Sequence, residues 1–321
     1  MSNANRYLTL IKRELIEHRK AVVYAPFIVA GIMFVLILIS ALWNGAFKVN
    51  GTGFTAKMLE SAVATNGEET LALVHQGWMF GFFMIFHIAS GIVILTYLLS
   101  CLFDERKDRS TLFWRSLPVR DWETVMSKLV MATLIIPTIF LVALALLQAL
   151  IVITFVVTCW QNQIDATRFV WTPLPFLATQ FWQFVSTFAG ILWALPVIGW
   201  ILLCSAYAKQ RPILLVLLVP GVIAAAVMML NLGKSAMWAF GGRDPARDMI
   251  VDYFSRFGHL FIPMVGGNWK DSFENIDETL LRVEPIISHV VSVKGLTGAL
   301  IGVVLIGAAI WVRRYREDAA I

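Results

Sequence analysis

The sequence predicts an all-α integral membrane protein with six transmembrane helices, an N-terminal amphipathic interfacial helix and a small helical outer segment. The 321 residues are 59% hydrophobic and 15% charged, whereas soluble domains are about 45–50% apolar and about 25% charged. Apolar runs long enough to cross a bilayer recur along the chain. Cations are concentrated in alternate connections between these runs. This excess of apolar surface is predicted to face lipid.

The apolar runs set the organisation of the chain. Pro137, Pro196 and Pro220 fall inside runs, and we expect each to kink its helix because proline lacks an amide N–H. The first run is too long for the apolar region of a signal peptide, so it is expected to stay as a membrane anchor. The predicted spans are 21–43, 79–103, 129–158, 178–207, 212–230 and 296–312.

These spans divide the chain into four regions. The first is a cytoplasmic amphipathic helix, and the second contains transmembrane helices one to five. An extracytoplasmic segment and the last span with its basic tail complete the chain. In order, the regions are 1–20, 21–230, 231–295 and 296–321.

Residues 5–20 begin the chain with a predicted amphipathic helix. Tyr7, Leu8, Ile11 and Leu15 share one face of this helix, while cations lie elsewhere around it. A helix of this kind lies on a membrane surface with its cations toward anionic headgroups. The alternative is a solvated N-terminal helix.

The distribution of lysine and arginine predicts that both termini are cytoplasmic. The connections that would face outward hold few cations, apart from the long outer segment, whose length makes it a poor reporter. We interpret the sequence pI of about 9.2 as this topology signal rather than as a sign of nucleic-acid binding. The chain is expected in the cytoplasmic (inner) membrane of a bacterium. The cation-rich segments are 6–20, 106–128, 209–211 and 313–316.

The outer segment is predicted to contain helices of its own. Asp244-Pro245 is typical of a helix N-cap followed by proline in the first turn, and Gly258 is a typical helix end. A second helix is expected within 272–284, ahead of Pro285. Together they would form a small helical cap on the outer membrane surface.

The connection after the second span is the most informative part of the sequence. Leu112, Phe113 and Leu117 are too hydrophobic for a solvated loop, although charged residues surround them. They are expected to dock into a groove, either on this chain or on a partner. The alternative is a juxtamembrane helix that rests on lipid.

This connection resembles that of the permease family of ABC-2-type transporters. The matching residues are Asp104-Glu105-Arg106, Ser110-Thr111-Leu112, Leu117-Pro118-Val119 and Lys128, with Ser110 where many members have glycine. The resemblance implies that 104–123 is a coupling segment that inserts into a groove of an ATPase subunit. Its implied ATPase contacts are Glu105, Arg106, Arg109, Trp114 and Arg115.

The resemblance also implies partners and a function. Two permease subunits, identical or related, would enclose a pathway above two ATPase subunits and act as an exporter. The long outer segment 231–295 departs from the family pattern. This departure leaves open an alternative function, in which the chain is a non-transporting assembly or signalling subunit that relays ATPase movement to a periplasmic partner. A polar pathway would favour transport, and a sealed apolar interface would favour the relay.

We expect no enzymatic activity, cofactor or metal site in this chain itself. Gly233-Lys234-Ser235 resembles the end of a P-loop, but Met228 stands where that loop needs glycine. His87, with Gln148, is the candidate intramembrane polar site. A stand-alone channel or carrier is disfavoured because no Asp, Glu, Lys or Arg lies deep in a predicted span. An intramembrane enzyme is weaker still.

Small residues offer a packing hypothesis. Gly77/Gly81 and Gly298/Gly302 have the GxxxG spacing that permits close helix approach in membranes, although glycine is common there by chance. The three cysteines are scattered and predict neither a disulfide framework nor a metal site.

Overall fold

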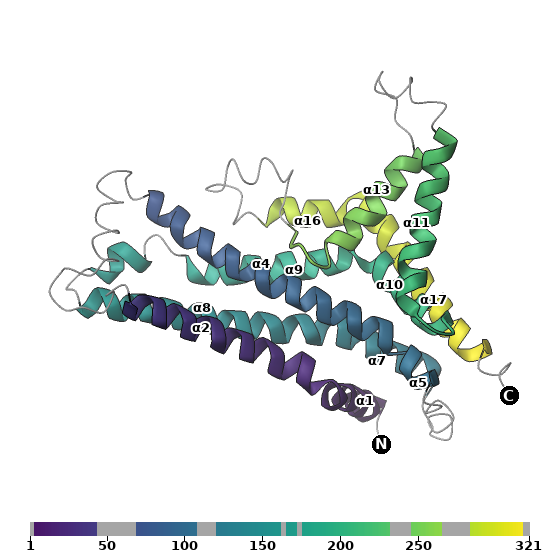
Figure 1. Cartoon of the computed structure of the whole chain (residues 1–321), viewed down its shortest axis with the longest axis horizontal. Helices are drawn as coiled ribbons and strands as arrows, with labels where there is room; N and C mark the ends of the chain where they lie inside the picture. The colour runs from purple at the N-terminus through teal and green to yellow at the C-terminus, as the bar shows by residue number, and fades with distance from the viewer. Residues whose placement is uncertain are drawn as a thin grey trace.

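Figure 1 shows the computed structural model of the chain, in which every regular element among the described residues is a helix. The structure describes residues 3–43, 69–107, 120–161, 165–171, 175–231, 245–264 and 283–316. The helices are α1 (Asn3–Glu17), η1 (Lys20–Tyr24), α2 (Ala25–Trp43), α4 (Glu69–Ser100), α5 (Phe103–Lys107), α7 (Asp121–Val130), η2 (Met131–Ile135), α8 (Ile136–Gln161), η3 (Thr167–Trp171), α9 (Phe176–Trp193), α10 (Leu195–Tyr207), α11 (Pro212–Asn231), α13 (Pro245–Gly258), α16 (Glu284–Val291) and α17 (Val293–Arg316).

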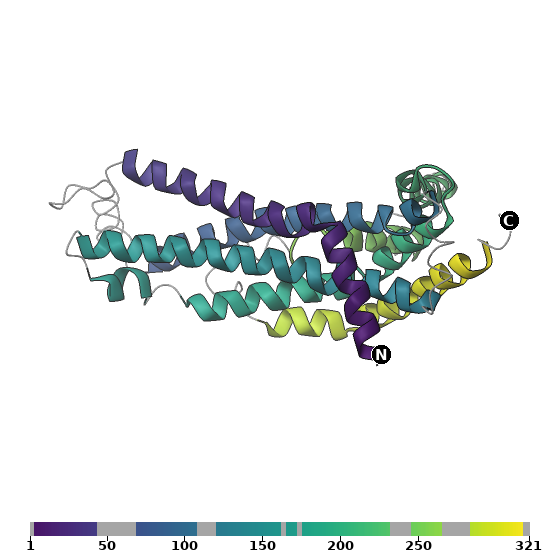
Figure 2. The same ribbon diagram turned by 90° about the horizontal axis from the view of Figure 1, so that it is seen from below.

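The predicted N-terminal helix is present as α1. The π-helical turn η1 joins it to α2, and Figure 2 shows that α1 turns sharply away from the axis of α2. Part of its apolar stripe packs on α7, where the Tyr7 ring lies 5.7 Å from that of Trp122. Leu8 and Ile16 remain exposed. The helix therefore has a protein-facing side as well as an exposed apolar side.

Four helical stretches are long and apolar enough to cross a membrane. They contain most of the predicted first, second, third and sixth spans. Figures 1 and 2 both show α2, α4 and α8 running side by side, and both α2 and α4 contact α8. The four stretches are Lys20–Ser40, Val74–Lys107, Asp121–Gln161 and Val293–Tyr315.

The predicted fourth span, 178–207, is not one continuous helix. It consists of α9 and α10, whose axes differ by 55° across a break at Ala194. Pro196 lies in the first turn of α10, where its missing N–H removes no helical hydrogen bond. The pair counts as a fifth candidate span only if the two helices cross together.

The predicted fifth span is represented by α11, with Pro220 inside it. Its apolar stretch, Pro212–Ala226, is shorter than the other candidates. In Figure 1, α11 and α13 diverge together from the layer of long helices. The structure therefore establishes a helical protein with several membrane-spanning candidates, but it does not confirm a sixth span.

Close packing between α10 and α17 depends on glycine. A Cβ added to Gly302 would lie 2.8 Å from the carbonyl carbon of Leu195, and one added to Gly199 would lie 2.8 Å from the carbonyl oxygen of Gly302. Cβ atoms at Gly77 or Gly81 would have nothing within 4 Å among the described neighbours. The predicted pair Gly298/Gly302 is thus part of a close helix contact. The pair Gly77/Gly81 makes no such contact within the described part of the chain.

The outer segment differs from the expected cap. Helix α13 begins at Pro245 and ends at Gly258, as predicted. The chain then inserts among the long helices, and a Cβ on Gly91 in α4 would collide with the carbonyl of Leu260. The described stretch 259–264 is therefore interleaved with the bundle, because Leu260 and Met264 bury their apolar side chains there.

A further helix, α16, follows at the end of the outer segment. Helix α16 starts at Glu284 and carries Pro285 in its first turn, where proline is well tolerated. Most of the predicted range 272–284, and Asp244 of the predicted N-cap, lie outside the described residues.

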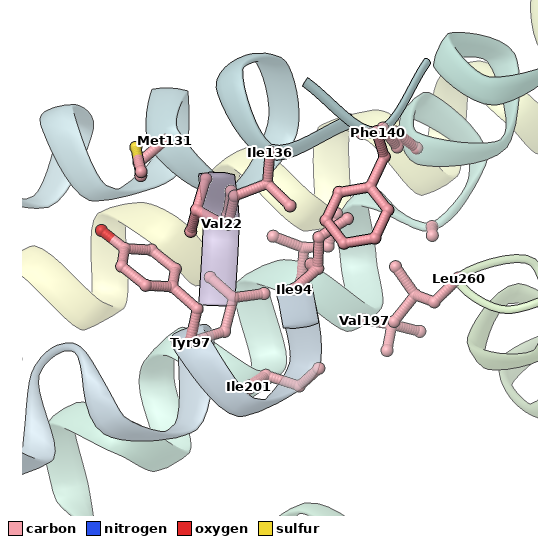
Figure 3. Packing of buried hydrophobic residues seen from close by; sticks show 14 of the residues in the cluster. Val22, Ile94, Tyr97, Met131, Ile136, Phe140, Val197, Ile201 and Leu260 are labelled. Carbon is pink, nitrogen blue, oxygen red and sulfur yellow. The ribbon is translucent and has the colours of Figure 1, made fainter. Parts of the chain in front are cut away.

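The buried core lies where the long helices meet α10 and the stretch after α13. Figure 3 shows side chains from these elements packed together, with the hydroxyl of Tyr97 at the edge of the cluster. Residues such as Ile136, Val197 and Ile201 are fully buried. The labelled members are Val22, Ile94, Tyr97, Met131, Ile136, Phe140, Val197, Ile201 and Leu260.

Candidate functional site: a buried ion network

Segments far apart in the sequence meet at one end of the molecule. Figures 1 and 2 place α1, α5, α7 and the end of α17 there, together with both chain termini. The turn between α10 and α11 lies there as well, since Arg106 in α5 contacts its carbonyls. These are the segments for which the cation distribution predicts a common, cytoplasmic side.

Charged side chains from these helices form a buried network. The ammonium of Lys128 in α7 lies 2.8 Å from Oε1 of Glu14 in α1 and 3.0 Å from Oε1 of Glu105 in α5. Nη1 of Arg313 in α17 lies 3.0 Å from Oε2 of Glu105, and its Nε lies 3.6 Å from Oδ1 of Asp121. The network therefore joins both ends of the chain to both ends of the predicted coupling segment.

Burial makes this network strongly interdependent. The side chains of Lys128 and Glu14 are only 2% and 4% exposed, and those of Arg313 and Glu105 are nearly as buried. Removing ions from water is costly unless opposite charges and hydrogen bonds compensate. Two cations and two buried carboxylates balance here, so the loss of one member leaves an uncompensated charge.

Glu14 also accepts a hydrogen bond from the hydroxyl of Tyr97 in α4, with an oxygen–oxygen distance of 2.9 Å. Burial by itself would raise the pKa of Glu14, but the ammonium of Lys128 and the Tyr97 hydroxyl outweigh it. The pKa of Glu14 is consequently held below its ordinary value, and this carboxylate stays ionised at neutral pH.

Sequence analysis did not select Glu14, Lys128 or Arg313 as site residues. The available signal was Glu14, which follows Tyr7 by seven positions and Ile11 by three and thus interrupts the apolar stripe. Lys128 was predicted only as the motif lysine that enters the third span, and Arg313 only as one of the cations that indicate a cytoplasmic side. Their pairing depends on helix packing, which the sequence pattern does not specify.

The predicted coupling residues have different positions. Glu105 is inside the network, so a direct contact with a second protein would have to break its ion pairs. Arg106 donates hydrogen bonds to the carbonyls of Ser205 and Ala208 at 2.7 and 2.8 Å. It thereby ties α5 to the end of α10. Arg109, Trp114 and Arg115 lie outside the described residues, and their contact with an ATPase stays a prediction.

His87 and Gln148 do not form one site. Gln148 donates to the carbonyl of Met79 at 3.0 Å and accepts from the amide of Gln180 in α9. His87 lies two turns further along α4, where its Nε2 is 3.5 Å from the carbonyl oxygen of His259. Each contact ties helices together. The cavity beside His87 measures about 10 Å³, which is at the lower limit for one water molecule.

A third buried cation, Arg256, enters the bundle from α13. It donates to the carbonyl of Trp193 at 3.0 Å and to that of Lys294 at 2.8 Å, and its Nε pairs with Asp252. The guanidinium also lies 4.1 Å from the ring centre of Trp193. Arg256 therefore caps the carbonyl end of α9 at its break, where the helix dipole favours a cation.

The fold and its apolar helices define the class of this chain as a multi-pass α-helical membrane protein. No protein family, curated protein or solved structure matches the chain in comparison. The ion network and the segment that it holds are therefore the basis for a functional proposal.

Proposed function

We propose that this chain is the membrane-spanning subunit of an ABC-2-type, ATP-driven transporter, working as an exporter with a separate ATPase subunit. The ATPase would dock at the end of the molecule that holds both termini. The proposal rests on the motif resemblance of 104–128 and on the geometry of the ion network around that segment.

The observation that carries the proposal is that one cation holds both ends of the coupling segment. Arg313 contacts Glu105 near the start of 104–123 and Asp121 near its end. Lys128 extends the connection to α1. A displacement of the segment by an ATPase would consequently act on α4, α7, α17 and α1 together, as coupling requires.

The surface beside this segment supports docking of a protein partner. An open groove of about 590 Å³ lies between α5 and the α10–α11 turn. Phe103 and Ile213 contribute apolar surface to it, while Asp104, Lys107 and Arg211 contribute both signs of charge. Charged rims around apolar surface are typical of protein interfaces.

The positions of the cations support a cytoplasmic location for this end. Lysines and arginines of α1, α5, α7, the α10–α11 turn and the end of α17 gather there. The positive-inside rule favours a cytoplasmic location for such an end, and we propose that the membrane is the inner membrane of a bacterium. A pair of permease subunits, identical or related, with two ATPases would complete the complex.

One observation favours the relay function as a second candidate. Near His87 the described interior is closed by Phe83, Phe86, Phe140 and Leu144 around a very small cavity. A non-transporting subunit would use such a sealed bundle to pass ATPase movement to a periplasmic partner at the outer segment. Transport would instead need a pathway between two subunits.

Co-purification tests the proposal. The tagged full chain, produced in its native host, should retain a P-loop ATPase. A variant with Arg109→Glu, Trp114→Ala and Arg115→Glu should lose that ATPase without losing thermal stability. A matched charge reversal at Lys48, on the predicted outer side, should retain it. Failure of the intact chain to retain any ATPase would overturn the proposal.

Coupling can be separated from docking with Glu105→Gln. This change removes the charge that Arg313 and Lys128 share. It alters none of the predicted ATPase contacts Arg109, Trp114 and Arg115. We expect the variant to retain the ATPase while membrane-subunit stimulation of ATP hydrolysis falls. Equal stimulation of ATP hydrolysis by the unmodified chain and by Glu105→Gln would contradict a role of the ion network in coupling.

A further inference from the structure

A second cavity lies away from the ion network, between α10, α11, α13 and α17. Its volume is about 320 Å³, within the range of small-ligand pockets. Trp200, Ile223 and Leu305 are among its mostly apolar lining residues. Two further lining residues, Phe254 and Ile301, are about half exposed, so the cavity opens on the outside of the helix bundle.

Two hydrogen-bond donors belong to residues that line this cavity. The hydroxyl of Tyr253 and the indole N–H of Trp200 are buried, and neither has a hydrogen-bond partner within the described ranges. Protein atoms cover both donors almost completely. The lining therefore offers an occupant of the cavity carbon surface rather than these donors.

The charges of the cavity restrict the ligand further. Asp252 and Arg256 also line it, but they are paired with each other, and Arg256 donates its remaining bonds to backbone carbonyls. No described cation or anion of the lining is left to bind a charged group. The chemistry fits an uncharged apolar chain.

We propose that this cavity binds one acyl chain of a membrane glycerolipid. The exposed apolar faces of α11 and α17 beside the mouth would contact lipid in a membrane-spanning protein, so the ligand is available at the entrance. The bound chain would fill the space between α13 and the two helices of the α10–α17 contact. This inference does not depend on the proposed transport function.

Photolabelling of the purified full chain tests the site. The protein is placed in nanodiscs of phosphatidylcholine that contain a small fraction of phosphatidylcholine with a diazirine on one acyl chain. After illumination, mass spectrometry locates the label. Label concentrated in residues 196–200 and 250–254, relative to the exposed face of α2, is the expected result. Equal labelling of the cavity and of α2 would overturn the proposal.

Neighbouring positions on α17 provide a matched pair of variants. Ile301→Trp places a large side chain at the cavity mouth, and Leu300→Trp makes the same change at an exposed position outside the lining. The first should abolish the cavity label, and the second should preserve it. Loss of label in neither variant or in both would contradict the site.

The comparison within the unmodified chain keeps the test decisive if Ile301→Trp does not fold. Label on the cavity lining in excess of that on the exposed face of α2 requires no variant.

A further set of labelling and cross-linking experiments distinguishes other occupants of the cavity. If a diazirine fatty acid labels the cavity and the phospholipid does not, the glycerolipid assignment is wrong. If neither labels it and the variant Ile301→Cys cross-links two copies of the chain, a second copy covers the mouth. Either result would overturn the proposal.

Discussion

Nη1 of Arg313 lies 3.0 Å from Oε2 of Glu105, although the two residues are 208 positions apart in the chain. The pair links the last helix to the start of the predicted coupling segment. Because Lys128 contacts the other oxygen of Glu105, the three side chains form one continuous unit with Glu14. This connection brings the two ends of the chain into contact with the segment between the second and third spans.

Removing Arg313 should destabilise the protein strongly. Arg313→Gln leaves Glu105 with one cation, and breaking a buried ion pair in this way costs about 3–5 kcal/mol. Arg314→Gln changes the neighbouring exposed arginine and should cost well under about 1 kcal/mol. Thermal unfolding of both variants in detergent, followed by tryptophan fluorescence, checks this expectation. Similar midpoints for the two variants would contradict the structural importance of the network.

The network should also make stability depend on pH. The pKa of Glu14 is lower in the folded protein than the value of about 4.3 expected in an unfolded chain. Its contribution is therefore fully present above the unfolded pKa and is lost as the pH falls through the folded pKa. The thermal midpoint of Glu14→Gln should lie below that of the unmodified chain at pH 7. The difference between the two thermal midpoints should narrow below about pH 4. A difference that stays constant with pH would refute the stabilising role of the ionised Glu14 carboxylate.

Glycine substitutions on α17 should have opposite effects. A Cβ at Gly298 would collide with the guanidinium of Arg256, whereas one at Gly307 would meet nothing within 4 Å. Gly307→Ala should stabilise the helix by about 0.5–1 kcal/mol, because alanine loses less backbone entropy on folding. Gly298→Ala should lower the thermal midpoint. Two shifts of the same sign would show that Arg256 is not held at this position.

The planar guanidinium of Arg256, and not its positive charge alone, should be necessary to anchor α13. Arg256→Lys preserves the cation, but a single ammonium cannot reproduce the bonds to Trp193, Lys294 and Asp252 together. We expect a loss of about 1–3 kcal/mol and easier proteolysis of the α13 segment in the folded protein. Lys294→Ala provides the control, since only its backbone carbonyl is used. Equal proteolysis rates in the three proteins would argue against anchoring by Arg256.

The membrane class and most helices could be predicted from local pattern. Long apolar runs need helical backbone in lipid, so four of the predicted spans correspond to long helices. The amphipathic stripe predicted α1, and Pro245 with Gly258 predicted both ends of α13. The span predicted over 178–207 breaks beside Pro196, where a kink was expected, but the apolar run did not show that the two halves would differ in axis by 55°.

The candidate site residues likewise divide into features that a local pattern predicted and contacts that only packing determines. Glu105 and Arg106 stood out by motif, but the sequence could not show that one is buried in an ion network and the other bonded to the end of α10. His87 and Gln148 were expected to share a site, yet helix rotation directs them to different partners.

Hydropathy and charge order by themselves determined that this is a helical membrane protein and which segments share a side. Only the tertiary structure decided which charges meet, how far the axes of α9 and α10 diverge and how far the outer segment enters the bundle. The physical reason is that lipid selects for apolar composition and for satisfied backbone groups within each segment, which are local properties. Ion pairs between helices and the insertion of Arg256 depend on their relative rotation and depth, which are set by packing among residues far apart in the chain.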